Sequence, residues 1–213
     1  MEVNTYIDHT LLKADATKDE IKQLCIEAEQ YHFASVCVNS YWVAYCASLL
    51  KDCDVCVCSV IGFPLGAMST KAKVFEAKQA ILDGADEIDM VMNIGELKAG
   101  HDETVLEDIS NVVKVSEGRV VKVILETCLL TKEEIQRACK LCVKAKATFV
   151  KTSTGFSTNG ASVEDVKIMS KSVDGQCLIK AAGGIRTHQQ MLEMIEAGAS
   201  RIGTSNGVAL MKK

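Results

Sequence analysis

Short apolar runs alternate with segments of helical periodicity along the whole chain. Several of these runs are apolar at successive positions, which is typical of parallel strands that are covered on both faces. Turn residues separate them from the segments that follow. We therefore predict eight strands, at TYID (5–8), ASVCVN (34–39), VCVCSVIG (55–62), EIDMVM (87–92), VVKVILET (120–127), TFVK (148–151), CLIKAAGG (177–184) and RIGT (201–204).

Helical periodicity with terminal signals marks the segments between these runs. The clearest segments are 17–31, 69–85, 131–147 and 187–199. Thr17 is a predicted N-cap, because Glu20 follows at the spacing of a capping box. Gly84 and Gly198 are placed to end their helices, since glycine readily adopts the left-handed conformation found there. These signals predict helices that connect successive strands.

Regular alternation of strand and helix predicts an α/β protein with a parallel sheet. Eight such units in 213 residues fit a compact (β/α)8 barrel. The chain has one proline and no low-complexity linker, so we predict a single domain over residues 1–213. The run TYID is short, and without it the alternative is an open, doubly wound sheet of seven units.

Composition excludes several classes of protein. The net charge of −4 gives no basic footprint, so nucleic acid is not an expected partner. No uninterrupted apolar stretch approaches the roughly 18 residues of a membrane span, so no membrane association is expected. The N-terminal sequence MEVNTYIDHT has neither the basic region nor the apolar region of a signal peptide. We therefore expect a cytoplasmic protein.

The ten cysteines leave one alternative open. Without an export signal they are expected to be reduced thiols. Cys53, Cys56 and Cys58 form the densest group, and Cys139 and Cys142 are spaced to share one helix face. A zinc site built from both groups, in a non-catalytic metal-binding or redox protein, is conceivable. We favour a buried strand at 55–62, because free cysteine packs as a small hydrophobic residue.

Charged residues interrupt five of the predicted strands. Unpaired buried charges cost much free energy. A single such lysine is most simply explained by a side chain that points outward, but five at similar places favour convergence. In a barrel, inward-facing side chains near the C-terminal ends of the strands meet at one mouth. The five residues are Asp8, Lys151 and Lys180, which end TYID, TFVK and CLIK, and Asp89 and Lys122, which lie inside their runs.

A pocket of this kind suits amine chemistry. A lysine close to other cations in a partly desolvated site has a lowered pKa. Its neutral amine can attack a carbonyl and form a Schiff base, while a carboxylate and a second lysine move protons. No metal-ligand motif surrounds any histidine, and only His9, beside Asp8, is expected near such a site.

Three loops that follow predicted strands are rich in glycine and hydroxyl groups. They are 151–155, 181–188 and 201–207. Glycine allows the backbone to approach an anion closely, and a helix N-terminus supplies free N–H groups. In barrels a phosphate site is frequently built by the loops after strands 7 and 8, which are the last two of these loops. Ser205 and Asn206 are suitable N-terminal residues for a closing helix. We therefore predict a phosphate site here.

Taken together, the motifs resemble those of the deoxyribose-phosphate aldolases, which are class I aldolases. The resemblance covers nearly the whole chain in order, and DMVMNIG, KTSTGF and KAAGGIRT together are specific to it. The matching stretches are IDHTLL (7–12), VCVNS (36–40), IGFPLG (61–66), EIDMVMNIG (87–95), KVILET (122–127), FVKTSTGF (149–156), IKAAGGIRT (179–187) and RIGTSNG (201–207).

The resemblance implies a TIM barrel that reversibly cleaves 2-deoxy-D-ribose 5-phosphate to acetaldehyde and D-glyceraldehyde 3-phosphate. By position in the motifs, Lys151 corresponds to the Schiff-base lysine. Lys180 corresponds to a second lysine that keeps the nucleophile reactive, and Asp89 to a carboxylate that shuttles protons with a water. Asp8 and Lys122 correspond to supporting polar residues of the pocket.

The resemblance also implies how substrate and subunits are bound. The residues that match the 5-phosphate site are Gly155, Gly183, Gly184, Gly203 and Ser205. Phe156 stands where some members have a lysine that reaches the phosphate, so backbone groups are expected to carry more of the binding here. Cys37 matches a cysteine found near the site in some members, and we interpret it as a packed thiol.

The same resemblance implies no metal, no organic cofactor and a homodimer or homotetramer. A related class I aldolase or transaldolase-like barrel with another donor is the alternative.

Overall fold

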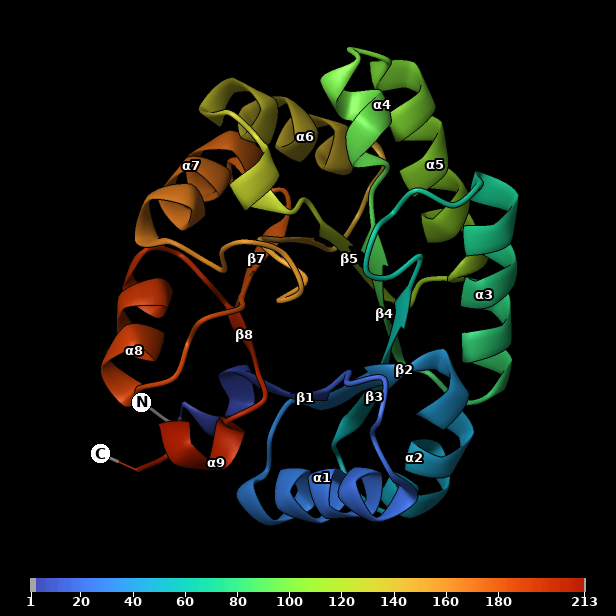
Figure 1. Ribbon diagram of the computed structural model, residues 1–213, viewed down its shortest axis with the longest axis vertical. Helices are drawn as coiled ribbons and strands as arrows, with labels where there is room; N and C mark the ends of the chain where they lie inside the picture. The colour runs from blue at the N-terminus through green and yellow to red at the C-terminus, as the bar shows by residue number, and fades with distance from the viewer. Residues whose placement is uncertain (1–2, 213) are drawn as a thin grey trace.

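The computed structural model describes residues 3–212, and its eight parallel strands close into a barrel in chain order (Figure 1). Residues 1–2 and 213 of the predicted domain lie outside the described residues. The predicted (β/α)8 barrel is confirmed, and the open seven-unit sheet is wrong because the first strand pairs with both the second and the eighth. The strands are β1 (Ile7–Leu11), β2 (Ser35–Asn39), β3 (Cys56–Ile61), β4 (Glu87–Val91), β5 (Val120–Ile124), β6 (Phe149–Lys151), β7 (Leu178–Ala182) and β8 (Arg201–Thr204).

Helices surround this barrel on all sides in Figure 1 and cover the outer face of the sheet. The α-helices are α1 (Lys18–Tyr31), α2 (Val43–Leu50), α3 (Thr70–Leu82), α4 (Ile94–Lys98), α5 (Asp102–Val115), α6 (Lys132–Lys144), α7 (Val163–Val173), α8 (His188–Glu196) and α9 (Gly207–Leu210). Short 3-10 helices precede β1 (η1, Asn4–Tyr6) and follow β2 (η2, Ser40–Trp42) and β5 (η3, Thr127–Leu129). Within the described range, no helix is long and apolar enough to cross a membrane.

The local signals read from the sequence set the ends of several helices. Thr17 accepts a hydrogen bond from the backbone N–H of Glu20, whose side chain returns to the Thr17 backbone, so the predicted capping box is confirmed. Gly84 and Gly198 follow the ends of α3 and α8 with φ of +104° and +117°, as a left-handed end requires. Asn206 is the N-cap of α9 but makes no side-chain capping hydrogen bond there.

The predicted first strand was placed too early in the chain. Residues up to Tyr6 form η1, and β1 runs from Ile7 to Leu11. Asp8 is therefore the second residue of its strand and does not end it. Lys180 likewise lies in the middle of β7, not at its end. The predicted strand 120–127 also ends earlier, because Glu126 adopts a left-handed backbone conformation with φ of +56°.

The strands divide their side chains between two environments. The outward positions, such as Val36, Ile88 and Val123, are fully buried against the helices and belong to the large apolar core. The inward positions carry the predicted charges, and the apolar cluster that faces them is small, consisting of Leu12, Cys37, Cys58 and Val60. The barrel interior is therefore mostly polar, and the apolar core is the layer between sheet and helices.

Candidate active site

The structure brings all five predicted charges together inside the barrel. Asp8, Asp89, Lys122 and Lys180 have no exposed surface, and Lys151 is 3% exposed. They come from β1, β4, β5, β7 and β6 respectively, so five strands far apart in the sequence contribute one side chain each. The expected convergence is therefore observed, although only Lys151 stands at the C-terminal end of its strand.

Asp89 is the centre of this group. Its Oδ2 atom accepts hydrogen bonds from Nζ of both Lys151 and Lys180, each at 2.7 Å. Its Oδ1 atom accepts from Lys122 at 2.8 Å. One carboxylate thus contacts three lysines, and a proton on either Lys151 or Lys180 can reach the same oxygen atom.

Asp8 holds two of these lysines from the opposite side of the barrel. Its Oδ2 atom lies 2.5 Å from Nζ of Lys180 and 3.8 Å from Nζ of Lys122. Ser35 donates its hydroxyl proton to Oδ1 of Asp8 at 2.7 Å. Lys180 therefore lies between two carboxylates, whereas Lys151 contacts only Asp89 among the carboxylates of the described chain.

Sequence reasoning missed two further charges of the interior, Glu87 and Arg201. Glu87 accepts a hydrogen bond from Lys122 at 2.6 Å. Arg201 donates to Oδ1 of Asp8 at 2.7 Å and to Glu87 at 3.3 Å. Both are the first residues of their strands, where a charged residue resembles a strand boundary. A signal was available in the alternation of Glu87 with Asp89, because residues two apart share one face of a strand.

Attraction between the carboxylates and the lysines affects the pKa values in this network more than burial does. Burial alone would raise the pKa of Asp89, but Lys122, Lys151 and Lys180 hold it well below its usual range. Burial would likewise raise the pKa of Asp8, which Lys180 and the other cations lower instead.

The pKa values of the lysines in the network shift in the opposite direction, upward. Burial would lower the pKa of Lys122, which Asp89 and its other anionic neighbours raise well above the usual value. The pKa of Lys180 is raised in the same way, because Asp8 and Asp89 outweigh its burial. Asp8, Asp89, Lys122 and Lys180 are therefore all charged near neutral pH.

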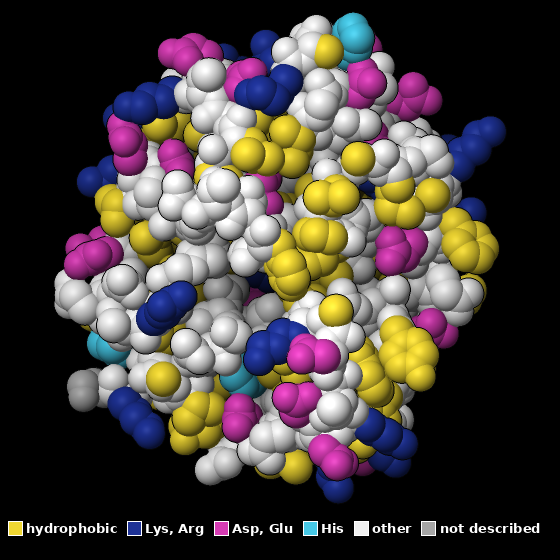
Figure 2. Space-filling model, in the orientation of Figure 1, with side chains coloured by type: hydrophobic (Ala, Val, Ile, Leu, Met, Phe, Trp, Pro, Cys, Tyr) yellow, Lys and Arg dark blue, Asp and Glu magenta, His cyan; other side chains and the backbone are white. Residues whose placement is uncertain are grey.

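A cavity of about 280 Å³ opens above the network, at the C-terminal end of the strands. Lys151 lines it, whereas the other interior charges lie beneath and do not. Figure 2 shows the face over the barrel hollowed near its centre, with hydrophobic side chains gathered along one side of the hollow. A molecule in this cavity would therefore contact the charge network through the amine of Lys151.

The rest of the cavity wall contains every residue that the resemblance implied for a phosphate site. These are Gly155, Gly183, Gly184, Gly203 and Ser205. Gly183 and Gly184 have φ of +82° and +79°, a conformation that few other residues adopt, so their backbone can turn toward the cavity. Two exposed cations that sequence reasoning did not single out, Lys13 and Arg186, also line the wall.

A buried carboxylate fixes the loop that follows Lys151. Glu126 accepts a hydrogen bond from the Thr154 hydroxyl at 2.5 Å and another from its backbone N–H at 3.2 Å. Phe156 is 56% exposed, and its ring contacts that of Phe63 edge to face at 5.2 Å between centroids. The loop is therefore anchored on its inner side and apolar on its outer side.

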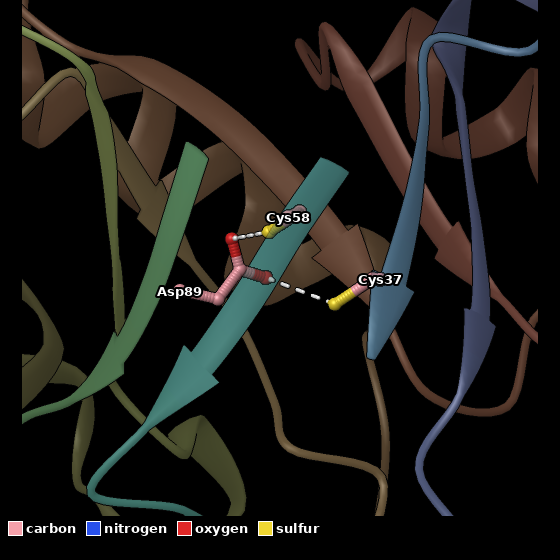
Figure 3. Close-up of side chains that lie close together, drawn as sticks. All are labelled: Cys37, Cys58 and Asp89. Atoms are coloured by element: carbon pink, nitrogen blue, oxygen red, sulfur yellow. Dashed lines mark hydrogen bonds between the residues drawn. The ribbon is translucent and has the colours of Figure 1, made fainter. Parts of the chain in front are cut away.

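Two thiols complete the surroundings of Asp89 (Figure 3). Cys58 on β3 and Cys37 on β2 donate to its two carboxylate oxygens at 3.1 and 4.0 Å. These three side chains are the only metal-ligating group among residues 3–212, with ligand atoms within 4.8 Å of one another. A bound cation would have to displace the ammonium groups that already neutralise Asp89, so the group is better suited to hydrogen bonding.

One alternative and one expectation about other residues are not met. The zinc site built from both cysteine groups is wrong, because Cys139 and Cys142 lie on α6 and belong to no such group in the described chain. His9 points away from the barrel interior. Its Nε2 atom lies 2.7 Å from Glu27 on α1, and its ring packs edge to face on Phe33.

Comparison with known proteins gives a consistent result. Residues 3–213 match the model of the DeoC/LacD family of aldolases. The chain is 59% identical over 212 residues to deoxyribose-phosphate aldolase 1 of Mesoplasma florum, covering 100% of this chain and 96% of that protein. It is 57% identical over 212 residues to the deoxyribose-phosphate aldolase of Finegoldia magna, with all of both chains covered.

Solved structures agree with these relatives. The tetrameric deoxyribose phosphate aldolase of Aeropyrum pernix superposes with a TM-score of 0.92 at 33% identity, covering 98% of this chain and 88% of that one. The similarity extends over the whole barrel and its surrounding helices.

Proposed function

The chain belongs to the DeoC/LacD family of aldolases, and from this premise we propose that it cleaves 2-deoxy-D-ribose 5-phosphate reversibly through a Schiff base at Lys151. The products are acetaldehyde and D-glyceraldehyde 3-phosphate. One observation carries the assignment of the nucleophile. Of the charged side chains inside the barrel, Lys151 alone lines the cavity that a substrate can enter. We propose that the enzyme acts in deoxyribose phosphate catabolism.

The reaction begins with attack of the neutral Lys151 amine on the aldehyde carbon of the open-chain sugar. Loss of water from the adduct gives an iminium ion. The C3 hydroxyl then loses its proton and becomes the aldehyde of the leaving fragment, while the C2–C3 bond breaks and its electrons move toward the iminium nitrogen. Glyceraldehyde 3-phosphate leaves and an enamine remains. Protonation of the enamine and addition of water release acetaldehyde and restore the amine.

Asp89 and Lys180 are proposed to move the protons. Oδ2 of Asp89 lies 2.7 Å from both Lys151 and Lys180, within the range for direct proton transfer. A water between Asp89 and the substrate is proposed to carry the proton to and from the reacting carbon atoms. Lys122 and Asp8 hold these two residues in place through the contacts described above.

The phosphate is proposed to bind on the opposite wall of the cavity. Gly183, Gly184, Gly203 and Ser205 offer backbone groups there, and Arg186 supplies a positive charge at the rim. The cavity volume of about 280 Å³ suits a five-carbon sugar phosphate, which places its aldehyde near Lys151 while the phosphate remains at the rim.

The test is trapping of the Schiff base. The protein is incubated with acetaldehyde and cyanoborohydride, digested, and analysed by peptide mass spectrometry. We expect a two-carbon adduct on Lys151, its absence in Lys151→Met, and no aldol cleavage by that variant. An adduct on another lysine, or full activity of the variant, would refute the mechanism. Dihydroxyacetone in place of acetaldehyde tests the alternative of a related aldolase with another donor.

Assembly and location are also proposals. We propose a cytoplasmic homodimer or homotetramer, supported by the tetramer described for the Aeropyrum pernix relative. Light scattering of the purified protein measures the subunit number, and a monomer at working concentration would contradict the proposed assembly. Fractionation of the source cells tests the location.

A further inference from the structure

Glu87 and Arg201 lie beneath the proposed reaction centre and do not line the cavity. Glu87 precedes Asp89 by two residues on β4, and Arg201 precedes Gly203, the register partner of Asp8, by two residues on β8. Both therefore lie one layer closer to the N-terminal ends of the strands. Neither contacts the space that a substrate would occupy, so neither is a catalytic residue.

The pair nevertheless belongs to the same network of charges. Arg201 bridges the Asp8 and Glu87 carboxylates, and Glu87 in turn accepts a hydrogen bond from Lys122 at 2.6 Å. The guanidinium also lies 5.5 Å from the centre of the Phe149 ring, a cation–π contact that fixes its position. Only 16% of the Arg201 side chain and 5% of that of Glu87 are exposed.

Glu87 and Arg201 contribute one negative and one positive charge to the barrel interior. The barrel interior holds three carboxylates, those of Asp8, Glu87 and Asp89. Three cations other than the proposed nucleophile face them, namely Lys122, Lys180 and Arg201. These six groups balance one another, so a proton on Lys151, which shares Asp89 with Lys122 and Lys180, leaves the barrel interior with one net positive charge. The thiols of Cys37 and Cys58 are placed as donors toward Asp89, so we count both as neutral.

We propose that Glu87 and Arg201 are positioning residues that set this charge balance and thereby the pH range in which Lys151 reacts. The inference rests on the proposed function, because it assigns the Schiff base to Lys151. Arginine suits the role, since its guanidinium keeps its charge at every pH that the protein survives and can bind two carboxylates at once. A lysine in its place would retain the charge but not the paired contacts.

A purely structural role for the pair predicts something different. If the two residues only fill the base of the barrel, removing either one destabilises the fold and slows the reaction at all pH values alike. If they set the balance, removing the cation favours the Lys151 ammonium and removing the anion disfavours it. The two changes must then shift the pH dependence of the reaction in opposite directions.

The experiment measures the rate of reductive trapping of acetaldehyde at Lys151 between pH 5 and 10. Acetaldehyde carries no titrating group, so its pH profile reports on the protein. We expect Arg201→Met to move the midpoint of the profile to higher pH and Glu87→Gln to move it to lower pH. Glu87 on β4 and Arg201 on β8 each lie two strands away from Lys151 on β6, at a distance of about 10 Å. At that distance, removal of one charge is expected to shift the midpoint by roughly one pH unit.

Combined and conservative variants test the charge itself. The double variant Glu87→Gln with Arg201→Met restores the balance, so its midpoint is expected to return to that of the wild type. Arg201→Lys keeps the charge and is expected to leave the midpoint unchanged. If the single variants do not fold, these two carry the test, and a shifted midpoint in either would overturn the proposal.

A matched pair on the surface serves as the control. Lys132 and Glu164 form an ion pair with side chains 62% and 65% exposed. Lys132→Met and Glu164→Gln make the same charge changes outside the barrel and are expected to shift nothing. Shifts of equal sign in Arg201→Met and Glu87→Gln, or none in either, would overturn the charge-balance role. Absence of any adduct on Lys151 in the wild type would instead overturn the proposed function.

Discussion

Replacing Asp89 by asparagine removes a carboxylate that contacts three lysines, with almost no change of shape. Breaking a buried ion pair in this way costs about 3–5 kcal/mol of stability. This loss of stability is limited because one of the three lysines can release its proton and become neutral in the folded variant. Deprotonating a lysine with an unfolded-state pKa of about 10.4 costs about 4.6 kcal/mol at pH 7 and about 1.9 kcal/mol at pH 9. We therefore expect a loss of about 4–5 kcal/mol at pH 7 that falls toward about 2 kcal/mol at pH 9.

The sign of this pH dependence follows from proton binding. In Asp89→Asn the folded state binds one proton fewer than the unfolded state, so its stability rises with pH. In the wild type, the raised pKa values of Lys122 and Lys180 stabilise the fold until the pH approaches about 10, where this contribution begins to be lost. The lowered pKa values of Asp8 and Asp89 contribute stability that is present above about pH 4. Wild-type stability from these groups is therefore level between pH 7 and 9.

Urea unfolding at pH 7, 8 and 9 measures the difference, with the single tryptophan, Trp42, as the fluorescent probe. Asp108→Asn is the matched control, because Asp108 holds the buried Lys73 at 2.5 Å between α3 and α5, outside the barrel. We expect a similar pH-dependent loss of stability there with aldolase turnover retained. Asp89→Asn is expected to lose turnover by roughly 10²–10⁴-fold. A loss of stability that is equal at pH 7 and pH 9 would refute the reasoning.

Three further predictions concern residues that line the cavity near the proposed phosphate site and the stability of the protein at low pH. In Gly203→Ala the new Cβ would lie 2.9 Å from Cβ of Ala182 and 3.1 Å from Cε of Lys180, so we expect about 1–3 kcal/mol lower stability in urea and a reduced kcat. Full activity would contradict this. Lys13→Ala and Arg186→Ala are each expected to raise KM for deoxyribose 5-phosphate about tenfold while leaving acetaldehyde trapping unchanged, and equal effects on both would contradict phosphate binding. The lowered pKa of Asp8 predicts that stability falls steeply as the pH drops below about 4, and stability in urea that is constant from pH 6 to 2 would contradict it.

Most of the fold was predictable because its signals are local. Strands buried on both faces are recognisable from their apolar runs, and Thr17 and Gly84 mark helix ends through hydrogen bonds and backbone conformations that neighbouring residues determine. The first strand was misplaced because it includes His9 and Thr10. His9 is tolerated there because Glu27, 18 residues later, pairs with its ring. Partners so distant in sequence cannot be read from a hydrophobic pattern.

The interior charges of the candidate site were predictable only where a charge broke an apolar run. Lys122 and Lys151 stand out for that reason, since each follows a buried valine. Glu87 and Arg201 do not, because a charge at the first residue of a strand resembles the end of the preceding loop. The closed barrel alone brings them together, although they lie 114 positions apart in the sequence. Arg186 was missed for a related reason, because the position of a loop side chain depends on the fold around it.

The outer face of the barrel sheet is apolar and stabilises the fold, whereas the inner face carries the charged residues of the proposed site. In a TIM barrel, branched apolar side chains usually fill the interior in layers. Here charges occupy much of that space, and replacing buried ion pairs by well-packed apolar residues is often neutral or stabilising. The network is therefore not explained by stability, which the apolar layer between sheet and helices supplies. We propose that its value lies in holding Lys151 against Asp89 at the base of the cavity, where the Schiff base is proposed to form.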